Sequence, residues 1–190
     1  MLGRVVRLLE QFLQPVVVVA APGEPVGEIP KSVLLLHDRA RGRGPLEGIA
    51  VGLSAIRATA TTAFVVGCDA PLLRAAFARR LIELAAKHDA AAALVDGQPQ
   101  PLPGVYSTQV LDETQRRLAD GSMSLRGLLE SVDTRWVRAE ELEDADPKLQ
   151  SLMNVNRAED YFAALATAGF EAPPEVRARL RGPEENRRAN

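Results

Sequence analysis

The chain contains few of the residues that build disulfides, zinc sites or histidine-rich sites. Its 190 residues include one cysteine, Cys68, and two histidines. A single cysteine excludes an intrachain disulfide and a zinc site made of several cysteines. Long apolar runs are absent too, since none approaches the roughly 20 residues that a helix needs to cross a bilayer. The first residues show no apolar stretch with a signal-peptide cleavage pattern. We therefore expect a cytoplasmic protein that does not contact membranes.

An excess of either charge is also absent. The chain carries 23 Lys and Arg against 25 Asp and Glu, which gives a net charge of −2. This balance implies no general attraction to nucleic acid, so we expect no nucleic-acid partner. The remaining composition, 46% hydrophobic and 25% charged, is typical of a soluble globular protein. The length favours a single domain with a sizeable core.

Short apolar runs alternate with amphipathic stretches in the first half of the chain. The pattern predicts strands at 16–20, 33–36, 63–67 and 90–95, and helices at 4–13, 46–56 and 75–87. The Asp96-Gly97 pair is expected to form a turn after the last of these strands. Alternation of strands and helices at this spacing predicts a mostly parallel α/β sheet with helices on both faces.

The pattern is looser in the second half. It predicts strands at 102–106 and 134–138, the second at or near a sheet edge, and an acidic loop at 139–150. It also predicts a helix at 109–119 and a short helix capped by Ser122. A last helix is expected to open with a capping box at 156–159 and to end at Gly169. We expect one domain over residues 1–170. The Pro-, Arg- and Glu-rich residues 171–190 are expected to form a disordered tail.

Asp69 follows the apolar run 63–67 and precedes Pro71. In open α/β sheets, ligands bind beyond the carboxyl ends of the strands. A carboxylate carried there by a rigid strand is suited to hold a divalent metal against a phosphate. Taken alone, Asp69 is equally well explained as the cap of a following helix or turn. Its neighbour Cys68 is expected to serve packing, because no histidine partner for a nucleophile is evident.

Two further clusters follow predicted strands. Asp38 ends the strand at 33–36 and leads into a loop with Gly44, Pro45 and Gly48. The glycines permit close backbone approach, and a helix beginning at Pro45 would present its N-terminus to an anion. An ordinary glycine-rich loop is the alternative.

The second of these clusters is a pair of asparagines, Asn154 and Asn156. The two side chains lie on the same side of the chain if this segment is extended. Asn156 also has a simpler interpretation as the cap of the helix that follows, and the two roles are compatible.

Together, these segments resemble the MobA-like molybdenum cofactor guanylyltransferases, a family of nucleotidyltransferases. The family motifs G-P-L-x-G, C-D-x-P and N-x-N-x-x-E-[DE] occur in order at 44–48, 68–71 and 154–160. The resemblance extends over about residues 1–168. It implies a Rossmann-like, mostly parallel sheet of the nucleotide-diphospho-sugar transferase type, with helices on both faces.

The resemblance assigns roles to the residues of the motifs. It implies that Asp69 is a Mg²⁺ ligand and that Asp38 contacts the guanine nucleotide. It also implies that Asn154 and Asn156 lie at the active site, where Asn156 helps to hold the metal. Gly44, Pro45 and Gly48 match the loop at the nucleotide. One position departs from the family, because Ala21 stands where an asparagine that contacts the nucleotide is expected.

The implied reaction is transfer of GMP from GTP to molybdopterin, with or without molybdenum, and release of pyrophosphate. The nucleophile is a phosphate anion, so positioning and charge neutralisation matter more than a general base. Arg41 and Arg43 are our own candidates for contacts with the incoming phosphate. Molybdoenzymes and other cofactor-biosynthesis proteins are expected as further partners. The alternatives are a molybdopterin cytidylyltransferase, a sugar-phosphate or phospholactate nucleotidyltransferase, or a non-catalytic nucleotide-binding relic.

One family element has no counterpart in the sequence. The family begins with a strand and a glycine-rich loop, L-A-G-G-x-S-x-R-M-G-x-x-K, whereas residues 1–4 match a position within its first helix. We expect the first strand to be missing from the sheet, with unpaired backbone on either side of its place. The loop would neutralise phosphate charge. The 190-residue chain alone is therefore expected to be a poor catalyst.

Overall fold

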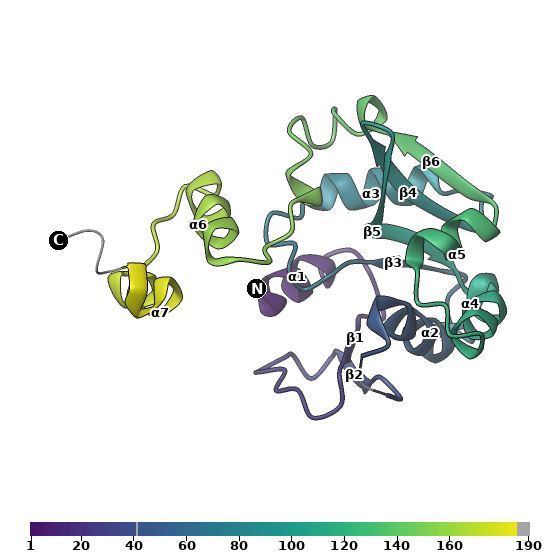
Figure 1. The fold of residues 1–190 in the computed structure, drawn as a ribbon. Helices are drawn as coiled ribbons and strands as arrows, with labels where there is room; N and C mark the ends of the chain where they lie inside the picture. The colour runs from purple at the N-terminus through teal and green to yellow at the C-terminus, as the bar shows by residue number, and fades with distance from the viewer. Residues whose placement is uncertain (41, 186–190) are drawn as a thin grey trace.

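The computed structural model describes residues 1–40 and 42–185, which form two sheets and the helices around them (Figure 1). In chain order the elements are α1 (Leu2–Leu9), β1 (Val17–Ala20), β2 (Leu34–His37), α2 (Gly44–Ile56), β3 (Thr62–Val65), α3 (Ala75–Leu84), β4 (Ala90–Val95), β5 (Gln98–Ser107), α4 (Leu111–Ala119), α5 (Leu125–Ser131), β6 (Thr134–Arg138), α6 (Ala158–Thr167) and α7 (Pro174–Glu185). The α/β class predicted from the sequence is confirmed.

The larger sheet has the strand order β3-β5-β4-β6. Strand β4 runs parallel to β6, whereas β5 runs antiparallel to both β3 and β4. The antiparallel strand follows from the turn at Asp96 and Gly97, whose φ angles of 49° and 73° suit a two-residue hairpin loop. Such a short loop can join only antiparallel strands. The larger sheet is therefore mixed, with two antiparallel pairs and one parallel pair, whereas the sequence predicts a mostly parallel sheet. Strand β6 lies at its edge, as the sequence predicts.

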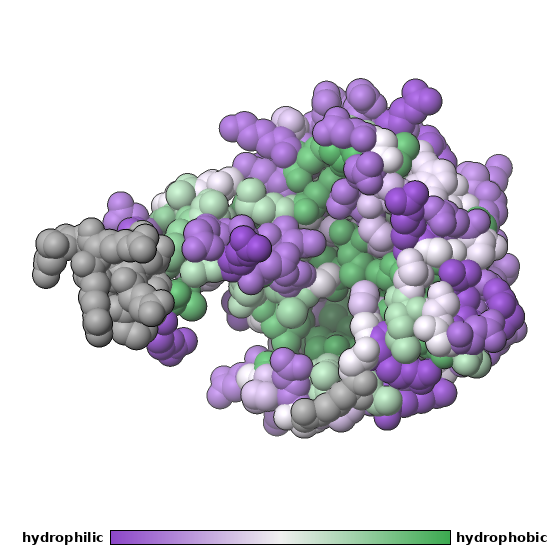
Figure 2. Space-filling view, in the orientation of Figure 1, coloured by the Kyte–Doolittle hydropathy of each residue, from purple (hydrophilic) through white to green (hydrophobic). Residues whose placement is uncertain are grey.

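The smaller sheet consists of the parallel pair β1 and β2, in register from Val17 opposite Leu34 to Ala20 opposite His37. Among the described residues, β1 pairs only with β2, and β3 pairs only with β5. A cavity of about 340 Å³ separates β1 from β3. Hydrophobic residues line the hollow that Figure 2 shows between the two parts of the molecule. The expected interruption of the sheet is therefore present in the fold.

Helices cover both faces of the larger sheet, as predicted. Helices α1 and α3 lie on one face, with Phe77 of α3 fully buried, and α2, α4 and α5 lie on the other, with Leu128 of α5 fully buried (Figure 1). Strand β4, in the interior of this sheet, presents only alanines over Ala90–Ala93, alternately toward the two faces. Each of these alanines is at most 1% exposed. Their small side chains allow helices to approach the sheet closely on both sides.

Two predicted helix caps differ from the structure. Ser124, rather than Ser122, caps α5, because its Oγ accepts a hydrogen bond from the Gly127 N–H at 3.0 Å. Helix α6 has Arg157 at its N-cap, so Asn156 is not its cap. The cap bonds are supplied instead by Asp160, whose carboxylate accepts hydrogen bonds from the backbone N–H groups of Asn156 and Arg157 at 3.1 and 2.9 Å.

The expectation of a disordered tail is wrong for residues 174–185, which form α7. Pro174 occupies the start of this helix, where its fixed φ angle is favourable, and Glu175 lies in the first turn, where a negative charge suits the helix dipole. Residues 186–190 lie outside the described residues. Helices α6 and α7 lie apart from the two sheets (Figure 1). Within the described part of the chain, no helix has the length and apolar character needed to cross a membrane.

Candidate functional site

Asp69 lies in a tight turn that follows β3. Its Oδ1 folds back over Gly67, where an added Cβ would collide with that oxygen. The Arg4 side chain of α1 donates a hydrogen bond from Nε to the Pro71 carbonyl at 2.5 Å and so ties the turn to α1. Helix α3 begins beyond this turn, with Arg74 at its N-cap. Asp69 therefore does not cap α3, and the glycine at position 67 makes room for its carboxylate.

The asparagine pair lies beside this turn. The backbone N–H of Val155 donates a hydrogen bond to the backbone carbonyl of Asp69 at 2.8 Å. Val155 is half-buried, whereas Asn154 and Asn156 on either side of it are exposed. This alternation matches the extended segment that the sequence predicts. The fold thus brings Asp69, Asn154 and Asn156 together from distant parts of the chain.

The cluster that contains Asp38 surrounds the start of α2. Asp38 continues the β1–β2 pairing, since its N–H donates to the Ala20 carbonyl at 2.9 Å. Its Oδ1 is buried without a hydrogen-bond partner among the described residues. An added Cβ on Gly48 would lie 3.8 Å from this oxygen, so the carboxylate rests against the first turns of α2. Burial raises the pKa of Asp38 above its usual value of 3.8, and the nearby Glu47 carboxylate adds to the rise, while His37 acts in the opposite direction.

Glu47 is an unexpected buried carboxylate in this cluster, with only 2% of its surface exposed. Its Oε1 accepts a hydrogen bond from the Arg39 N–H at 3.2 Å. The Arg43 guanidinium lies 3.2 Å from Oε2, and this contact is an ion pair without hydrogen-bond geometry. Arg43 also donates to the Leu118 carbonyl at 3.0 Å. Glu47 therefore holds both the backbone and a side chain of the loop that precedes α2.

These contacts argue against the expectation that the N-terminus of α2 binds an anion. Gly44 adopts the positive φ of 66° that favours glycine, and Pro45 occupies the first turn of the helix. The first turn, however, already carries the buried negative charge of Glu47. An anion at this helix N-terminus would face that charge. Arg43 is engaged by the protein itself and would have to leave two partners to reach a phosphate.

The other arginine that we considered for this contact, Arg41, lies outside the described residues.

The two clusters adjoin the same cavity. Pro45 and Gly48 of α2 line it on one side, and Gly67 and Cys68, the neighbours of Asp69, line it on the other. The exposed thiol of Cys68 is free. The cavity between the sheets therefore connects the surroundings of Asp38 with those of Asp69.

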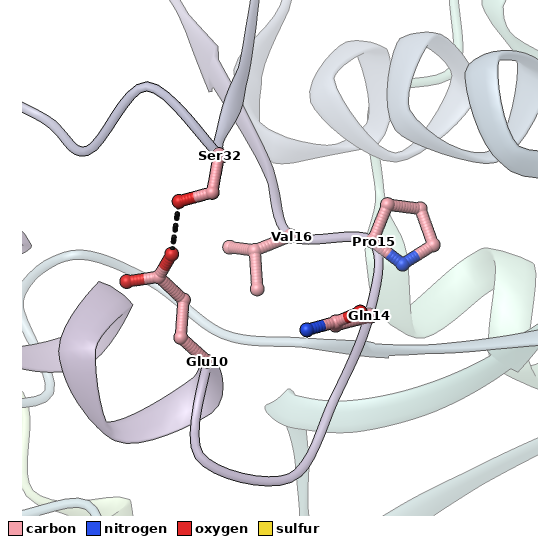
Figure 3. Close-up of a pocket in the computed structure, with 5 residues that line it drawn as sticks. All are labelled: Glu10, Gln14, Pro15, Val16 and Ser32. Atoms are coloured by element: carbon pink, nitrogen blue, oxygen red, sulfur yellow. Dashed lines mark hydrogen bonds between the residues drawn. The ribbon is translucent and has the colours of Figure 1, made fainter.

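A second cavity, of about 380 Å³, lies at the start of β1 and contains none of the predicted site residues (Figure 3). Figure 3 shows its five lining residues, Glu10, Gln14, Pro15, Val16 and Ser32. The Ser32 hydroxyl donates a hydrogen bond to the Glu10 carboxylate at 2.5 Å across it. We assign no function to this cavity.

The donor set near Asp69 fits a magnesium ion that is held largely by a substrate. Within residues 1–40 and 42–185, no group of three or more His, Cys, Asp or Glu side chains converges as a complete metal site. Mg²⁺ commonly binds to one or two carboxylates while waters and substrate phosphates complete its shell. The Asp69 carboxylate, oriented over Gly67, and the amide oxygens of Asn154 and Asn156 are hard donors of the required kind.

Sequence reasoning missed two buried carboxylates. Glu47 falls within the G-P-L-E-G motif, and its position next to the apolar face of Leu46, Ile49 and Ala50 is the signal that could have revealed its burial. Asp146 lies in the stretch that we expected to be an acidic loop, yet it is fully buried. Nothing in its local sequence marks it out from the exposed acids around it.

Residues 1–139 match the sequence family described as "MobA-like NTP transferase domain". A protein of Mycobacterium avium (strain 104) named "probable molybdenum cofactor guanylyltransferase" is 35% identical over 170 residues, which are 88% of this chain and 81% of that protein. A protein of Methanothermobacter thermautotrophicus with the same name is 35% identical over 138 residues, covering 70% of this chain and 68% of that protein.

Two solved structures share the fold. The crystal structure of molybdopterin-guanine dinucleotide biosynthesis protein A from Archaeoglobus fulgidus matches with a TM-score of 0.62 and 25% identity, over 72% of this chain and 68% of that one. The 2-C-methyl-D-erythritol 4-phosphate cytidylyltransferase from Thermus thermophilus matches with a TM-score of 0.62 over 87% of each chain. At 18% identity, the second match concerns the fold alone.

Proposed function

This chain belongs to the family of MobA-like NTP transferases, and we propose that it transfers GMP from GTP to molybdopterin in molybdenum cofactor biosynthesis. The names of the relatives from Mycobacterium avium and Methanothermobacter thermautotrophicus support this substrate assignment. The match to the Archaeoglobus fulgidus protein supports it through both fold and sequence. The proposal includes a cytoplasmic location and contacts with other cofactor-biosynthesis proteins or molybdoenzymes.

The observation that carries the proposal is the junction between Asp69 and the asparagine segment. The hydrogen bond from Val155 to the Asp69 carbonyl holds Asn154 and Asn156 next to a carboxylate at the exit of β3. The carboxylate itself is oriented by the space that Gly67 leaves. A carboxylate and two asparagines on adjoining backbone segments, beside a cavity between sheets, are suited to a metal-bound polyphosphate.

The reaction needs positioning and charge neutralisation. An oxygen of the terminal phosphate of molybdopterin attacks the α-phosphorus of GTP and forms a new P–O bond. The bond between the α-phosphorus and the oxygen bridging to the β-phosphate breaks, and pyrophosphate leaves with that electron pair. The attacking group is already an anion, so no side chain has to remove a proton. Asp69 and Asn156 would hold Mg²⁺, with Asn154 beside them, and the bound ion supplies neutralisation of phosphate charge.

Asp38 favours guanine as the base. Its buried Oδ1 lacks a hydrogen-bond donor among the described residues, and the second carboxylate, Glu47, lies close by. A ligand that reaches this place must therefore present donors. Guanine offers two adjacent donors, its ring N–H and its exocyclic amino group, whereas cytosine offers only an amino group beside acceptors. Gly48 places no side chain beside Asp38 Oδ1, where a Cβ would lie 3.8 Å away.

Calorimetric titration of the purified chain with GTP and with CTP, in the presence and absence of Mg²⁺, tests the proposal. We expect GTP binding that Mg²⁺ strengthens and a preference for GTP over CTP. In Asp69→Ala the effect of Mg²⁺ should be lost, while Asp38→Ala should weaken the preference for GTP. Mass spectrometry of reactions with molybdopterin should detect the guanine dinucleotide. The assignment would be refuted if Mg²⁺ did not change the affinity of the wild type for GTP. It would also be refuted if Mg²⁺ strengthened GTP binding to Asp69→Ala as much as to the wild type.

A further inference from the structure

We propose that Asp146 is a positioning residue which, through Ser151 and Arg74, holds the Asn154–Asn156 segment against the Asp69 turn. This inference rests on the proposed function, because it concerns the placement of the asparagines that would face the metal. Asp146 itself has no contact with that place. Its effect would pass through two other residues and the backbone.

Asp146 is buried within the loop between β6 and α6. The residue is 0% exposed. Its backbone N–H donates to the Leu142 carbonyl at 2.8 Å, and its carbonyl accepts from the Leu149 N–H at 2.8 Å. Its carboxylate Oδ2 accepts a hydrogen bond from the Ser151 N–H at 2.7 Å. Asp146 thus makes hydrogen bonds to residues that precede it and to residues that follow it in the loop.

Ser151 connects this loop to the start of α3. It is also 0% exposed, and its Oγ accepts a hydrogen bond from the Arg74 N–H at 3.1 Å. Arg74 is the N-cap residue of α3, where backbone N–H groups lack partners within the helix. The Arg74 guanidinium lies 3.9 Å from Asp146 Oδ1, which makes a second, longer connection. The loop is therefore fastened to the start of α3 at Ser151.

The same segment is fastened a second time at the Asp69 turn. The Val155 N–H donates to the Asp69 carbonyl at 2.8 Å, so the stretch 151–155 is held at both ends against the stretch 69–74. Asn154 lies within the held stretch, and Asn156 follows it directly. Loss of the attachment at Ser151 would leave the Val155 hydrogen bond to hold the asparagine segment against the Asp69 turn.

The chemistry at position 146 favours positioning over stability alone. Burying a carboxylate costs free energy, and Oδ1 has no hydrogen-bond partner among the described residues. A side chain there that served stability alone could be apolar. The carboxylate instead accepts the Ser151 N–H in a tight turn where Leu149 adopts a φ of 48°, a conformation that non-glycine residues seldom adopt. The hydrogen bond helps to maintain this turn.

Two readouts test the inference: amide hydrogen exchange of Val155 by NMR, and the affinity of Mn²⁺ for the protein in the presence of GTP. Hydrogen-bond partners of metal ligands commonly change metal affinity 10- to 100-fold. Asp146 acts from further away, so we expect Asp146→Ala to weaken Mn²⁺ binding by about tenfold, the lower end of that range. Exchange of the Val155 amide should accelerate. Asp146→Asn keeps an oxygen for the Ser151 N–H and should retain most of both properties. Ser151→Ala removes the attachment to Arg74 with a smaller loss of packing, so it should resemble Asp146→Ala in a milder form.

Two controls separate positioning from general destabilisation. Asp144→Ala removes an exposed acid from the same loop and should change neither readout. Leu128→Ala removes a fully buried side chain from the opposite face of the sheet and should lower the unfolding midpoint without weakening Mn²⁺ binding.

Unchanged Val155 exchange and Mn²⁺ affinity in folded Asp146→Ala and Ser151→Ala proteins would overturn the inference. Equal losses in Leu128→Ala would overturn it as well. If the wild type binds no Mn²⁺ with GTP, the proposed function fails, and the positioning role of Asp146 toward a metal fails with it. If Mn²⁺ and GTP bind normally while the Asp146 variants have no effect on either readout, only the inference fails.

Discussion

The two sheets carry the two halves of the candidate site, and they are supported very differently. Asp69 follows β3 of the four-stranded sheet, whose central strand is excluded from water at Ala90–Ala93. Asp38 follows β2 of the two-stranded sheet, where Leu34 and Leu35 remain 45% and 38% exposed. A two-stranded sheet is only marginally stable by itself. The Asp38 half of the candidate site is therefore built on the weaker support.

Helix α2 connects the two halves. It packs against β1 and β2 and also against β3. The Glu47 carboxylate at its start fastens the loop that leads from Asp38. The Asp38 half is held by α2, by a few polar contacts and by the valines at 16, 18 and 33, which reach the core around Phe77, whereas Asp69 follows a sheet that has helices on both faces. The following experiments test this contrast.

Core truncation should distinguish the two sheets most strongly. Phe77→Ala removes a 0% exposed ring between α3 and the larger sheet and should lower the free energy of unfolding by about 3–5 kcal/mol. Leu35→Ala in β2 changes a side chain that is 38% exposed and should cost less than about 1 kcal/mol. Urea denaturation of both variants measures the difference. Similar losses would show that the two sheets are equally well supported.

Hydrogen exchange should reveal the same contrast in the unmodified protein. Strand β4 is paired on both sides, whereas β1 and β2 pair only with each other among the described residues. Local opening requires less free energy where fewer packed contacts must break. We expect β1 and β2 amides to exchange about 100-fold faster than β4 amides, a difference of about 2.7 kcal/mol. Equal protection across the two sheets would contradict the contrast.

Removing the Glu47 side chain should lower stability by loosening the loop that follows Asp38. Glu47→Ala leaves the Arg39 N–H without its acceptor and Arg43 without its ion-pair partner, so it should cost about 2 kcal/mol. Glu47→Gln keeps an acceptor for Arg39 and should cost less, and the exposed Glu24→Ala serves as a control. Thermal or urea unfolding measures the losses. A Glu47→Ala protein as stable as the control would exclude this anchoring role.

The smallest effect concerns the pKa of Asp38, which burial and Glu47 raise above 3.8 in the folded protein while His37 opposes the rise. The folded state therefore binds more protons than the unfolded state in the range above 3.8, and the ionised carboxylate lowers stability as the pH rises through that range. Asp38→Asn should then be slightly more stable than the wild type near pH 7, by less than the effect of Glu47→Ala. The difference should vanish near pH 3, where Asp38 is protonated in both states.

Unfolding curves of the two proteins across this pH range provide the measurement. An Asp38→Asn protein that is less stable than the wild type near pH 7 would reverse the sign and would indicate a structural partner for the Asp38 carboxylate.

Much of the fold follows from local patterns. Short apolar runs predicted β1, β2, β3 and β4 within a few residues, because a buried strand leaves a continuous apolar signature. Boundaries that depend on capping geometry were less predictable: Ser124 rather than Ser122 caps α5, and Arg157 rather than Asn156 is the N-cap residue of α6. Neighbouring polar residues offer similar chemistry there, and only the backbone conformation selects one of them.

The candidate site shows the same division between local and long-range information. The chain alone places Asp38, Asp69, Asn154 and Asn156 at the exits of strands or in polar segments, because their residue types and neighbours are local properties. Only the tertiary structure joins Val155 to Asp69, buries Glu47 and Asp146, and sets the two sheets on either side of a cavity. Hydrogen-bond partners and most burial depend on residues distant in sequence, so the local pattern records little of them beyond the apolar neighbours of Glu47.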